Sequence, residues 1–389
     1  MKLGIVTAYY RPKVNACSVR INSFVDCWKE KRDCKLYVFT AGHEDLDNNE
    51  DKNIKIWRSN TSIVNNKKGI ISRLLSELYF SFLVFTKLLF VRVDKYLVTS
   101  PPFILTIGVM MISKIKQIPY IVDVRDLYPE VLFESNIISK KSLIGKLFLY
   151  LEKKIYNNAD KVITVTVGLK EYIERKTDKP VHLVRNGFDQ NLFFPEKFLE
   201  KSPFIIIFHG TIGKLQNIEL LIEYANYLKN NLIKDIEIWV VGDGPKRKMM
   251  LEEIEKKKLQ NIIKFYGFKT LEEVPKYINM ASIGFSPRND GFLNETAFPV
   301  KVYEYMGCGI PVIVTPISEA GDFIEKNKIG FQIENNDLEL LHKRIIHLKN
   351  NKSLYNEYSK RSVEVSKNFS RKKHALQLYD IIVGLINCN

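Results

Sequence analysis

The chain has 389 residues, 46% of them apolar and 26% charged, which is an ordinary globular composition with enough apolar material for two domains. Its 59 Lys and Arg against 44 Asp and Glu give a formal charge of +15, which favours a polyanionic partner, although a Lys- and Ile-rich composition explains such an excess equally well. The five cysteines lack C-x-x-C spacing, which argues against a zinc site and a thiol redox motif and fits a reduced, cytoplasmic protein.

The first half of the chain alternates short apolar runs with segments long enough for crossover helices. This pattern predicts a parallel sheet covered by helices on both faces. The opening apolar run is too short for a signal peptide, and no stretch reaches the ~20 apolar residues of a spanning helix. The expected strands are Leu3–Thr7, Lys35–Thr40, Lys95–Val98, Tyr120–Val124 and Lys161–Val165.

The segment Lys67–Lys95 has large apolar residues between lysines and arginines. Two compatible interpretations are open: a long helix that packs in the core, or a helix that lies flat in a membrane interface.

The second half repeats the alternation, so we expect an α/β protein with two doubly wound, Rossmann-like domains facing a central cleft. The expected domains are residues 1–198 and 199–368, with helices at the end of the chain. The expected strands are Phe204–Phe208, Glu237–Val241, Ile262–Phe265, Ile283–Phe285 and Val312–Thr315, and the expected helices are Asn217–Leu228, Lys246–Lys257, Leu271–Met280 and Lys301–Met306.

Three loops at the carboxyl ends of expected strands are candidate ligand contacts, because ligands of open α/β sheets bind there. The first loop, after Thr7, contains Asn15 and Ala16. The alternative interpretation of this loop is a plain connection between a strand and a helix. The second follows Phe208, where glycines and a lysine before a helix suit a phosphate; its candidates are Gly210, Thr211, Gly213 and Lys214. The third is Gly242-Asp243-Gly244-Pro245, a sharp turn that we interpret mainly as structural.

The most specific segment is Ala297–Val314, which predicts a loop, a helix, a glycine stop and a buried strand. Pro299 fits the first helical position. The amides near Phe298, Val300 and Lys301 would then point at an anion, and Glu304, one turn further on, could accept two ribose hydroxyls. The alternative interpretation is a surface Glu–Lys pair.

These segments resemble the retaining glycosyltransferases of family 4, which have the GT-B fold. The resemblance covers nearly the whole chain and is carried by Tyr-Tyr-Arg-Pro at 9–12, Arg-Asp-Leu-Tyr-Pro-Glu at 125–130, Arg-Asn-Gly-Phe-Asp at 185–189, Gly-Asp-Gly-Pro at 242–245 and Lys-Val-Tyr-Glu-Tyr-Met at 301–306. Within the family, Pro-x-Lys-Val-Tyr-Glu-Tyr-Met at 299–306 together with Arg-Asp-Leu-Tyr-Pro-Glu at 125–130 is similar to the branch of N-acetyl-L-fucosamine transferases of surface polysaccharide assembly.

The resemblance implies a nucleotide sugar, UDP-linked, held by the second domain, and transfer to a lipid-linked acceptor without metal or cofactor. It implies that the final helix, residues 369–389, packs back on the first domain. It also implies donor contacts from Arg288 and from the glycines Gly242 and Gly244, and acceptor contacts from Arg125, Asp126 and Asn186. We expect Asp126, Lys301 and Glu304 to be catalytic.

The sequence departs from the family at three positions. The family often has a glutamate eight residues before the one that is Glu304 here, where this chain has Thr296 with Glu295 beside it. It often has an arginine where this chain has Thr211, and a histidine where this chain has Arg125.

Other functions remain as alternatives. A GT-B-fold epimerase or a sugar-binding protein without activity would share the nucleotide site. The pair Asp45 and Asp47 resembles a metal motif but lies in a run of polar residues, and no nucleic-acid module is recognisable. We expect no nucleic-acid partner, an anionic membrane surface as partner, and a peripheral protein on the inner face of the plasma membrane.

Overall fold

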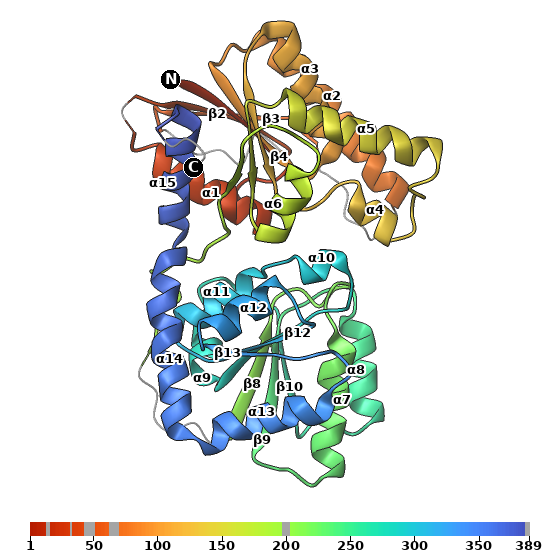
Figure 1. Cartoon of the computed structure of the whole chain (residues 1–389), viewed down its shortest axis with the longest axis vertical. Coiled ribbons are helices and arrows are strands. Elements are labelled where there is room, and N and C mark those ends of the chain that lie inside the picture. Colours follow the sequence, from red (N-terminus) through yellow and green to blue (C-terminus); the bar gives the residue numbers. More distant parts are fainter. Residues whose placement is uncertain (13–15, 32, 43–50, 62–69, 197–202, 386–389) are drawn as a thin grey trace. The chain divides into compact units, whose positions relative to one another are not determined.

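The computed structural model of the chain describes residues 1–12, 16–31, 33–42, 51–61, 70–196 and 203–385 (Figure 1). The chain divides into two compact units. Unit 1 consists of Met1–Asn186 with Arg371–Asn389, and unit 2 consists of Gly187–Ser370.

Unit 1 contains a seven-stranded parallel sheet with the strand order β3-β2-β1-β4-β5-β6-β7. The strands are β1 (Lys2–Val6), β2 (Lys35–Thr40), β3 (Ile54–Arg58), β4 (Lys95–Ser100), β5 (Tyr120–Val124), β6 (Lys161–Thr164) and β7 (Val181–Leu183). The interior strand β5 is buried along its whole length, which requires helices on both faces of the sheet.

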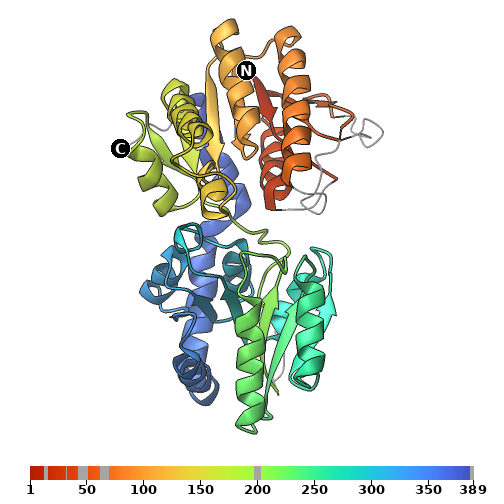
Figure 2. The ribbon, with the colours of Figure 1, turned by 90° about the vertical axis from the view of Figure 1, so that its right-hand side faces the viewer.

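The helices of unit 1 are α1 (Ala16–Trp28), α2 (Ile70–Phe90), α3 (Phe103–Lys116), α4 (Glu130–Glu134), α5 (Leu143–Asn158), α6 (Val167–Glu174) and α15 (Arg371–Val383). The helices α2, α3 and α5 lie in the crossover connections β3–β4, β4–β5 and β5–β6, which all run in the same direction across the sheet. Because such connections are right-handed, the three helices lie on the same face of the sheet. The helix α3 packs against both α2 and α5, and α2 and α3 lie side by side in Figure 2.

The last helix, α15, packs against α1 in unit 1. The indole N–H of Trp28 donates to the carbonyl of Ala375 at 2.7 Å, and Leu378 and Ile382 are buried in the same core. The end of the chain therefore completes the unit with which the chain begins.

Unit 2 contains a six-stranded parallel sheet with the order β10-β9-β8-β11-β12-β13. The strands are β8 (Phe204–His209), β9 (Ile236–Val241), β10 (Ile263–Gly267), β11 (Ile283–Pro287), β12 (Val312–Thr315) and β13 (Gly330–Gln332). The helices are α7 (Ile218–Asn230), α8 (Arg247–Lys256), α9 (Val274–Met280), α10 (Phe292–Glu295), α11 (Val300–Gly307), α12 (Glu319–Lys326), α13 (Leu338–Asn350) and α14 (Lys352–Ser366), followed by a 3-10 helix (Lys367–Phe369).

The division between the units differs from the expected boundary at 198/199, because residues after Asn186 already belong to unit 2. The rings of Phe188 and Phe193 are buried in its core, so the segment before the expected connector packs with the second sheet. The strands β3, β7 and β13 were not expected, because each is short and contains charged or polar residues.

None of the helices in the described ranges is long and apolar enough to cross a membrane.

Candidate functional site

The loops after β8 and β9 lie in direct backbone contact in unit 2. The amide of Gly210 donates to the carbonyl of Val241 at 2.9 Å, and the amide of Ile212 donates to the carbonyl of Asp243 at 3.0 Å. A Cβ at Gly242 would lie 1.9 Å from the carbonyl oxygen of Gly210, and one at Gly244 would lie 2.5 Å from that of Ile212. These two glycines are therefore required by the close approach of the two loops, which agrees with the structural interpretation of their turn.

Lys301 lies against the loop after β8. Its Nζ would be 3.8 Å from a Cβ placed on Gly210, lies 3.8 Å from the centroid of the Phe208 ring, and is 3.5 Å from Oε1 of Gln216. The residue is only 9% exposed. Burial and the charge of Arg288 lower the pKa of Lys301 to about 7, while Glu304 acts in the opposite direction. An anion bound beside this amine would favour its protonated form, and the proton would come from solvent.

Glu304 lies one turn after Lys301 on α11, beside a histidine. Its Oε2 is 3.3 Å from Nε2 of His209, and both side chains are 8% exposed. Burial, and then the charge of Lys301, hold the pKa of His209 well below its usual range, so the imidazole is neutral and the contact is not an ion pair. The ring of His209 also contacts Tyr305 edge-on at 5.0 Å. His209 was not selected from the sequence, although it directly precedes Gly210.

The beginning of α11 suits an anion. Pro299 is the N-cap with φ −61° and ψ 136°, and its side chain accepts no hydrogen bond from the first amides. Because this ψ is extended, the helix begins at Val300, and the expectation that Pro299 is its first helical residue is wrong. The Phe298 ring stacks on Tyr303 at 4.4 Å and is buried, so this ring holds the loop on the core. The amides of the first turn remain the feature that could bind a phosphate.

Lys214 does not lie at the beginning of a helix, contrary to expectation. It sits in a turn with an exposed side chain, and α7 begins only at Ile218. The cap of that helix is occupied, because Oδ1 of Asn217 accepts from the amide of Leu220 at 3.0 Å. Thr211 is also exposed, and Gly213 precedes the same turn. The positive charge beside Gly210 therefore comes from Lys301.

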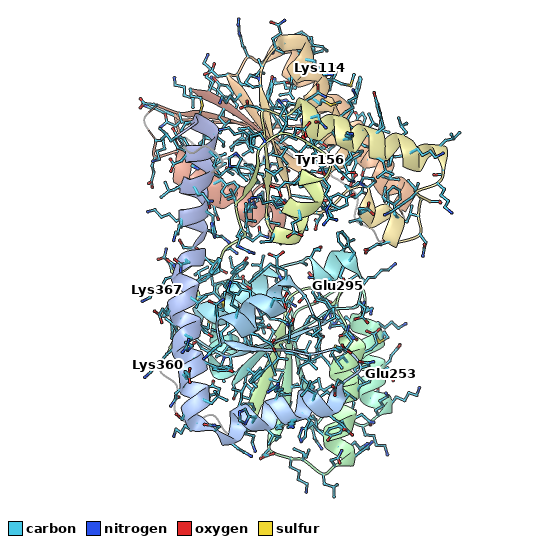
Figure 3. The ribbon with its side chains drawn as sticks, in the orientation of Figure 1. Lys114, Tyr156, Glu253, Glu295, Lys360 and Lys367 are labelled. Atoms are coloured by element: carbon cyan, nitrogen blue, oxygen red, sulfur yellow. The ribbon has the colours of Figure 1, made fainter. Side chains whose placement is uncertain are left out.

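Arg288 is held at the carboxyl end of β11. Its Nε donates to Oδ1 of Asn294 at 2.7 Å, and the side-chain Nδ2 of Asn294 donates to the carbonyl of Asn289 at 2.7 Å. Asn294 is only 4% exposed, which fixes this arrangement. Glu295, next in the chain, is exposed at the end of α10 (Figure 3). An asparagine that sequence reasoning did not identify thus positions Arg288, whose contact with the donor stays a prediction.

In unit 1, the candidate acceptor residues follow β5 and β7. Asp126 is exposed in the loop after β5. Nη1 of Arg125 donates to the carbonyl of Cys17 at 3.1 Å, and Oδ1 of Asn186 accepts from Nη1 of Arg20 at 3.3 Å. Asn15 lies outside the described residues, and the side chain of Ala16 lies outside them too.

A buried ion pair that the sequence analysis missed lies beneath these residues. Nε and Nη2 of Arg20 each donate to one carboxylate oxygen of Asp123 at 3.1 Å, and the two side chains are 5% and 0% exposed. The same guanidinium donates to the carbonyls of Val184 and Arg185 at 2.9 Å. The pair therefore ties α1 to β5 and to the end of β7. An aspartate inside an otherwise apolar strand was the available signal in the sequence.

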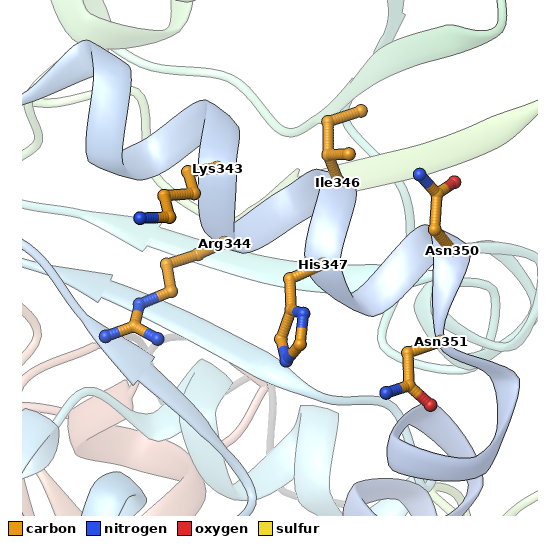
Figure 4. A pocket seen from close by; sticks show the side chains of 6 residues that line it. All are labelled: Lys343, Arg344, Ile346, His347, Asn350 and Asn351. Carbon is orange, nitrogen blue, oxygen red and sulfur yellow. The ribbon is translucent and has the colours of Figure 1, made fainter.

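A cavity of about 410 Å³ lies at the junction of α13 and α14 (Figure 4). It contains none of the expected site residues, and its lining consists of Lys343, Arg344, Ile346, His347, Asn350 and Asn351. Within the described ranges, no group of three or more His, Cys, Asp or Glu side chains could hold a metal ion, and Asp45 and Asp47 lie outside those ranges.

Comparisons with known proteins find similarity to glycosyltransferases. Residues 189–365 match the family Glycosyl transferases group 1. The glycosyltransferase MJ1178 of Methanocaldococcus jannaschii is 26% identical over 61% of this chain and 62% of its own length. The chitobiosyldiphosphodolichol beta-mannosyltransferase of Candida glabrata is 23% identical over 82% of this chain and 77% of its own length.

Several other matched relatives are glycosyltransferases of colanic acid, teichuronic acid and amylovoran biosynthesis by name. Among solved structures, Anabaena HepE in complex with UDP has a TM-score of 0.73 and 15% identity, and the match covers 99% of this chain and 100% of that chain. Residues 189–365 therefore resemble the group 1 glycosyltransferases, and the chain has the GT-B fold of the matched structures.

Proposed function

We propose that this protein is a retaining, metal-independent glycosyltransferase that moves a sugar from a UDP-sugar to a lipid-linked saccharide in the assembly of a bacterial surface polysaccharide. The observation that carries the proposal is the gathering of Lys301, Glu304 and the uncapped start of α11 around Gly210 at the carboxyl ends of the unit 2 strands. A nucleoside diphosphate needs such a set: a cation, free amides and a carboxylate for hydroxyl groups.

Each residue has a proposed task. Lys301, Arg288 and the α11 amides stabilise the departing diphosphate, and Glu304 accepts hydrogen bonds from the ribose. In unit 1, Asp126 orients the acceptor hydroxyl and receives its proton. The retaining outcome is what the family resemblance implies. The segment Lys-Val-Tyr-Glu-Tyr-Met supports a donor with an N-acetylated hexosamine or a 6-deoxyhexosamine.

The proposed acceptor and location rest on the names of relatives and on the net charge of the chain. The yeast relative is named for a diphosphodolichol acceptor, and several bacterial relatives are named for polysaccharides. The net charge of +15 suits the anionic inner face of the plasma membrane, where polyprenyl-linked saccharides would be met.

The direct test is transfer in the presence of a chelator. Radiolabelled nucleotide sugars are incubated with the full chain, EDTA and a polyprenyl-diphosphate sugar, and labelled lipid is measured. We expect label in the lipid with a UDP-sugar, because lysine, arginine and helix amides can hold the diphosphate without a metal. Interconversion of the sugar without acceptor would indicate an epimerase, and binding without turnover a binding protein. Loss of transfer in EDTA that magnesium or manganese restores would show that a metal holds the diphosphate.

Donor binding is expected to weaken as the pH rises through about 7, because the Lys301 ammonium loses its proton there. With UDP-N-acetylglucosamine, whose phosphates do not titrate in this range, the dissociation constant should rise about tenfold between about pH 6 and about pH 8. The variant Lys301→Met should lose this dependence and weaken binding at the lower pH by roughly 1.5–3 kcal/mol. Isothermal titration calorimetry measures both, with uridine as the ligand that should bind unchanged.

Two further results distinguish a binding role for Lys301 from a structural one. Lys301→Met should unfold at a higher temperature than the wild type, because it removes a desolvated amine that costs stability. The control Lys248→Met, at a side chain that is 88% exposed, should leave binding and melting unchanged. A Lys301→Met protein that melts earlier and binds UDP-N-acetylglucosamine normally would refute the assignment.

A further inference from the structure

We propose that the outer surface of α2, α3 and α5 in unit 1 docks on an anionic lipid bilayer, with apolar side chains inserted and lysines against the headgroups. This docking surface extends the proposed function, since a lipid-linked acceptor is presented at a bilayer. It does not depend on the donor site, which lies in unit 2.

The three helices form one layer on one face of the sheet. Each leads from the carboxyl end of one parallel strand to the amino end of another, so all three run in the same direction. The helix α3 packs between the other two, and its Lys116 holds the end of α2 by donating to the carbonyls of Leu88 and Val91 at 2.9 and 2.6 Å. The outer faces of the three helices, directed away from the sheet, therefore form one continuous surface on which a flat partner could dock.

That outer side carries large apolar side chains that nothing in the chain covers among the described residues. On α2 they recur at helical spacing along one stripe, and on α5 they occupy the first two turns, which is how an interfacial helix is built. Four of the aromatic side chains are more than half exposed. The exposed members are Leu75, Leu78, Tyr79, Phe82, Leu89 and Phe90 on α2, Met111 and Ile115 on α3, and Leu143, Ile144, Leu147 and Tyr150 on α5.

The exposed charge on the same layer is cationic. The only acidic residues of the three helices, Glu77 and Glu152, are both buried. Exposed basic residues lie on or directly beside the helices: Arg92, Lys114, Lys141, Lys146, Lys153 and Lys154, of which Lys114 is labelled in Figure 3. Lys140, beside α5, pairs with Glu130 at 2.7 Å.

This combination selects the partner. Apolar side chains rimmed by cations match a bilayer with anionic headgroups, in which both kinds of group find a counterpart. A second copy of the chain would bring like charges together, so self-association through this surface is disfavoured.

The test is co-sedimentation of the full chain with vesicles of equal parts phosphatidylglycerol and phosphatidylcholine, without donor or acceptor. The wild type should bind them, and ~1 M salt should weaken the binding by screening. Phe82→Ser combined with Leu147→Ser should weaken it about tenfold or more, because two apolar groups no longer insert. Lys141→Glu combined with Lys146→Glu should weaken binding to these vesicles and leave binding to pure phosphatidylcholine unchanged.

Matched controls lie in unit 2. Leu232→Ser combined with Phe268→Ser removes side chains that are 79% and 72% exposed and should leave vesicle binding unchanged.

Equal binding of wild type and the Phe82/Leu147 variant, or equal binding to anionic and neutral vesicles, would overturn the proposal. The proposal would also be overturned if the wild type did not bind vesicles and formed a dimer, while the Phe82/Leu147 variant was a monomer. Transfer to a short-chain, water-soluble acceptor by the same variants separates failure of this surface from failure of the proposed reaction.

Discussion

Replacing Glu304 by glutamine should lower the rate of sugar transfer by about 100-fold, the scale of one lost transition-state contact. The substitution keeps the shape of the side chain and removes its charge. Glu304 is 6% exposed and lies beside the neutral His209, so an amide fits the same space. The thermal melting of the variant should therefore remain close to that of the wild type.

The measurement is initial transfer rate at saturating donor, together with the melting temperature of each protein. Glu252→Gln is a matched control on unit 2, because that carboxylate is 65% exposed and pairs with Lys248 at 3.8 Å. Glu295→Gln tests whether the neighbouring glutamate takes the place of the family's earlier one. Near-wild-type turnover in Glu304→Gln would remove this residue from the proposed mechanism.

Replacing Arg20 by methionine should reduce the stability of unit 1 by about 3–5 kcal/mol, because it leaves a fully buried carboxylate without its cation. Asp123 is 0% exposed, and Arg20 supplies it with two hydrogen bonds. The loss should appear as a lower melting temperature and as faster amide hydrogen exchange in β5 and α1. Exchange in unit 2 should change little, since the pair lies wholly in unit 1.

Two variants make this result interpretable. The double variant Arg20→Met with Asp123→Leu should recover much of the lost stability, because a buried ion pair and an apolar pair of similar volume are often equivalent. Lys170→Met breaks a surface pair in the same unit, with side chains 36% and 48% exposed, and should cost less than ~0.5 kcal/mol. If Arg20→Met lowers the free energy of unfolding as little as Lys170→Met does, the buried pair does not stabilise the fold.

Much of the fold could be predicted from the sequence because its signals are local. The runs Lys35–Thr40, Tyr120–Val124 and Val312–Thr315 are strands with the expected bounds. A buried strand of a parallel sheet is a continuous apolar segment, which can be recognised directly in the sequence. β7, with His182 between two apolar residues, gives no such run, and only pairing with β6 makes it a strand.

The sequence by itself determined which loops are candidates for the site and that Lys301 and Glu304 share one helix, where residues three apart are neighbours. Only the tertiary structure decided that Lys301, rather than Lys214, lies beside Gly210, and that His209 lies beside Glu304. It also decided that Arg20 pairs with Asp123, which are 103 residues apart in the chain. Such contacts are set by the order of strands in a sheet, and no local pattern of residues encodes which distant side chains that order brings together.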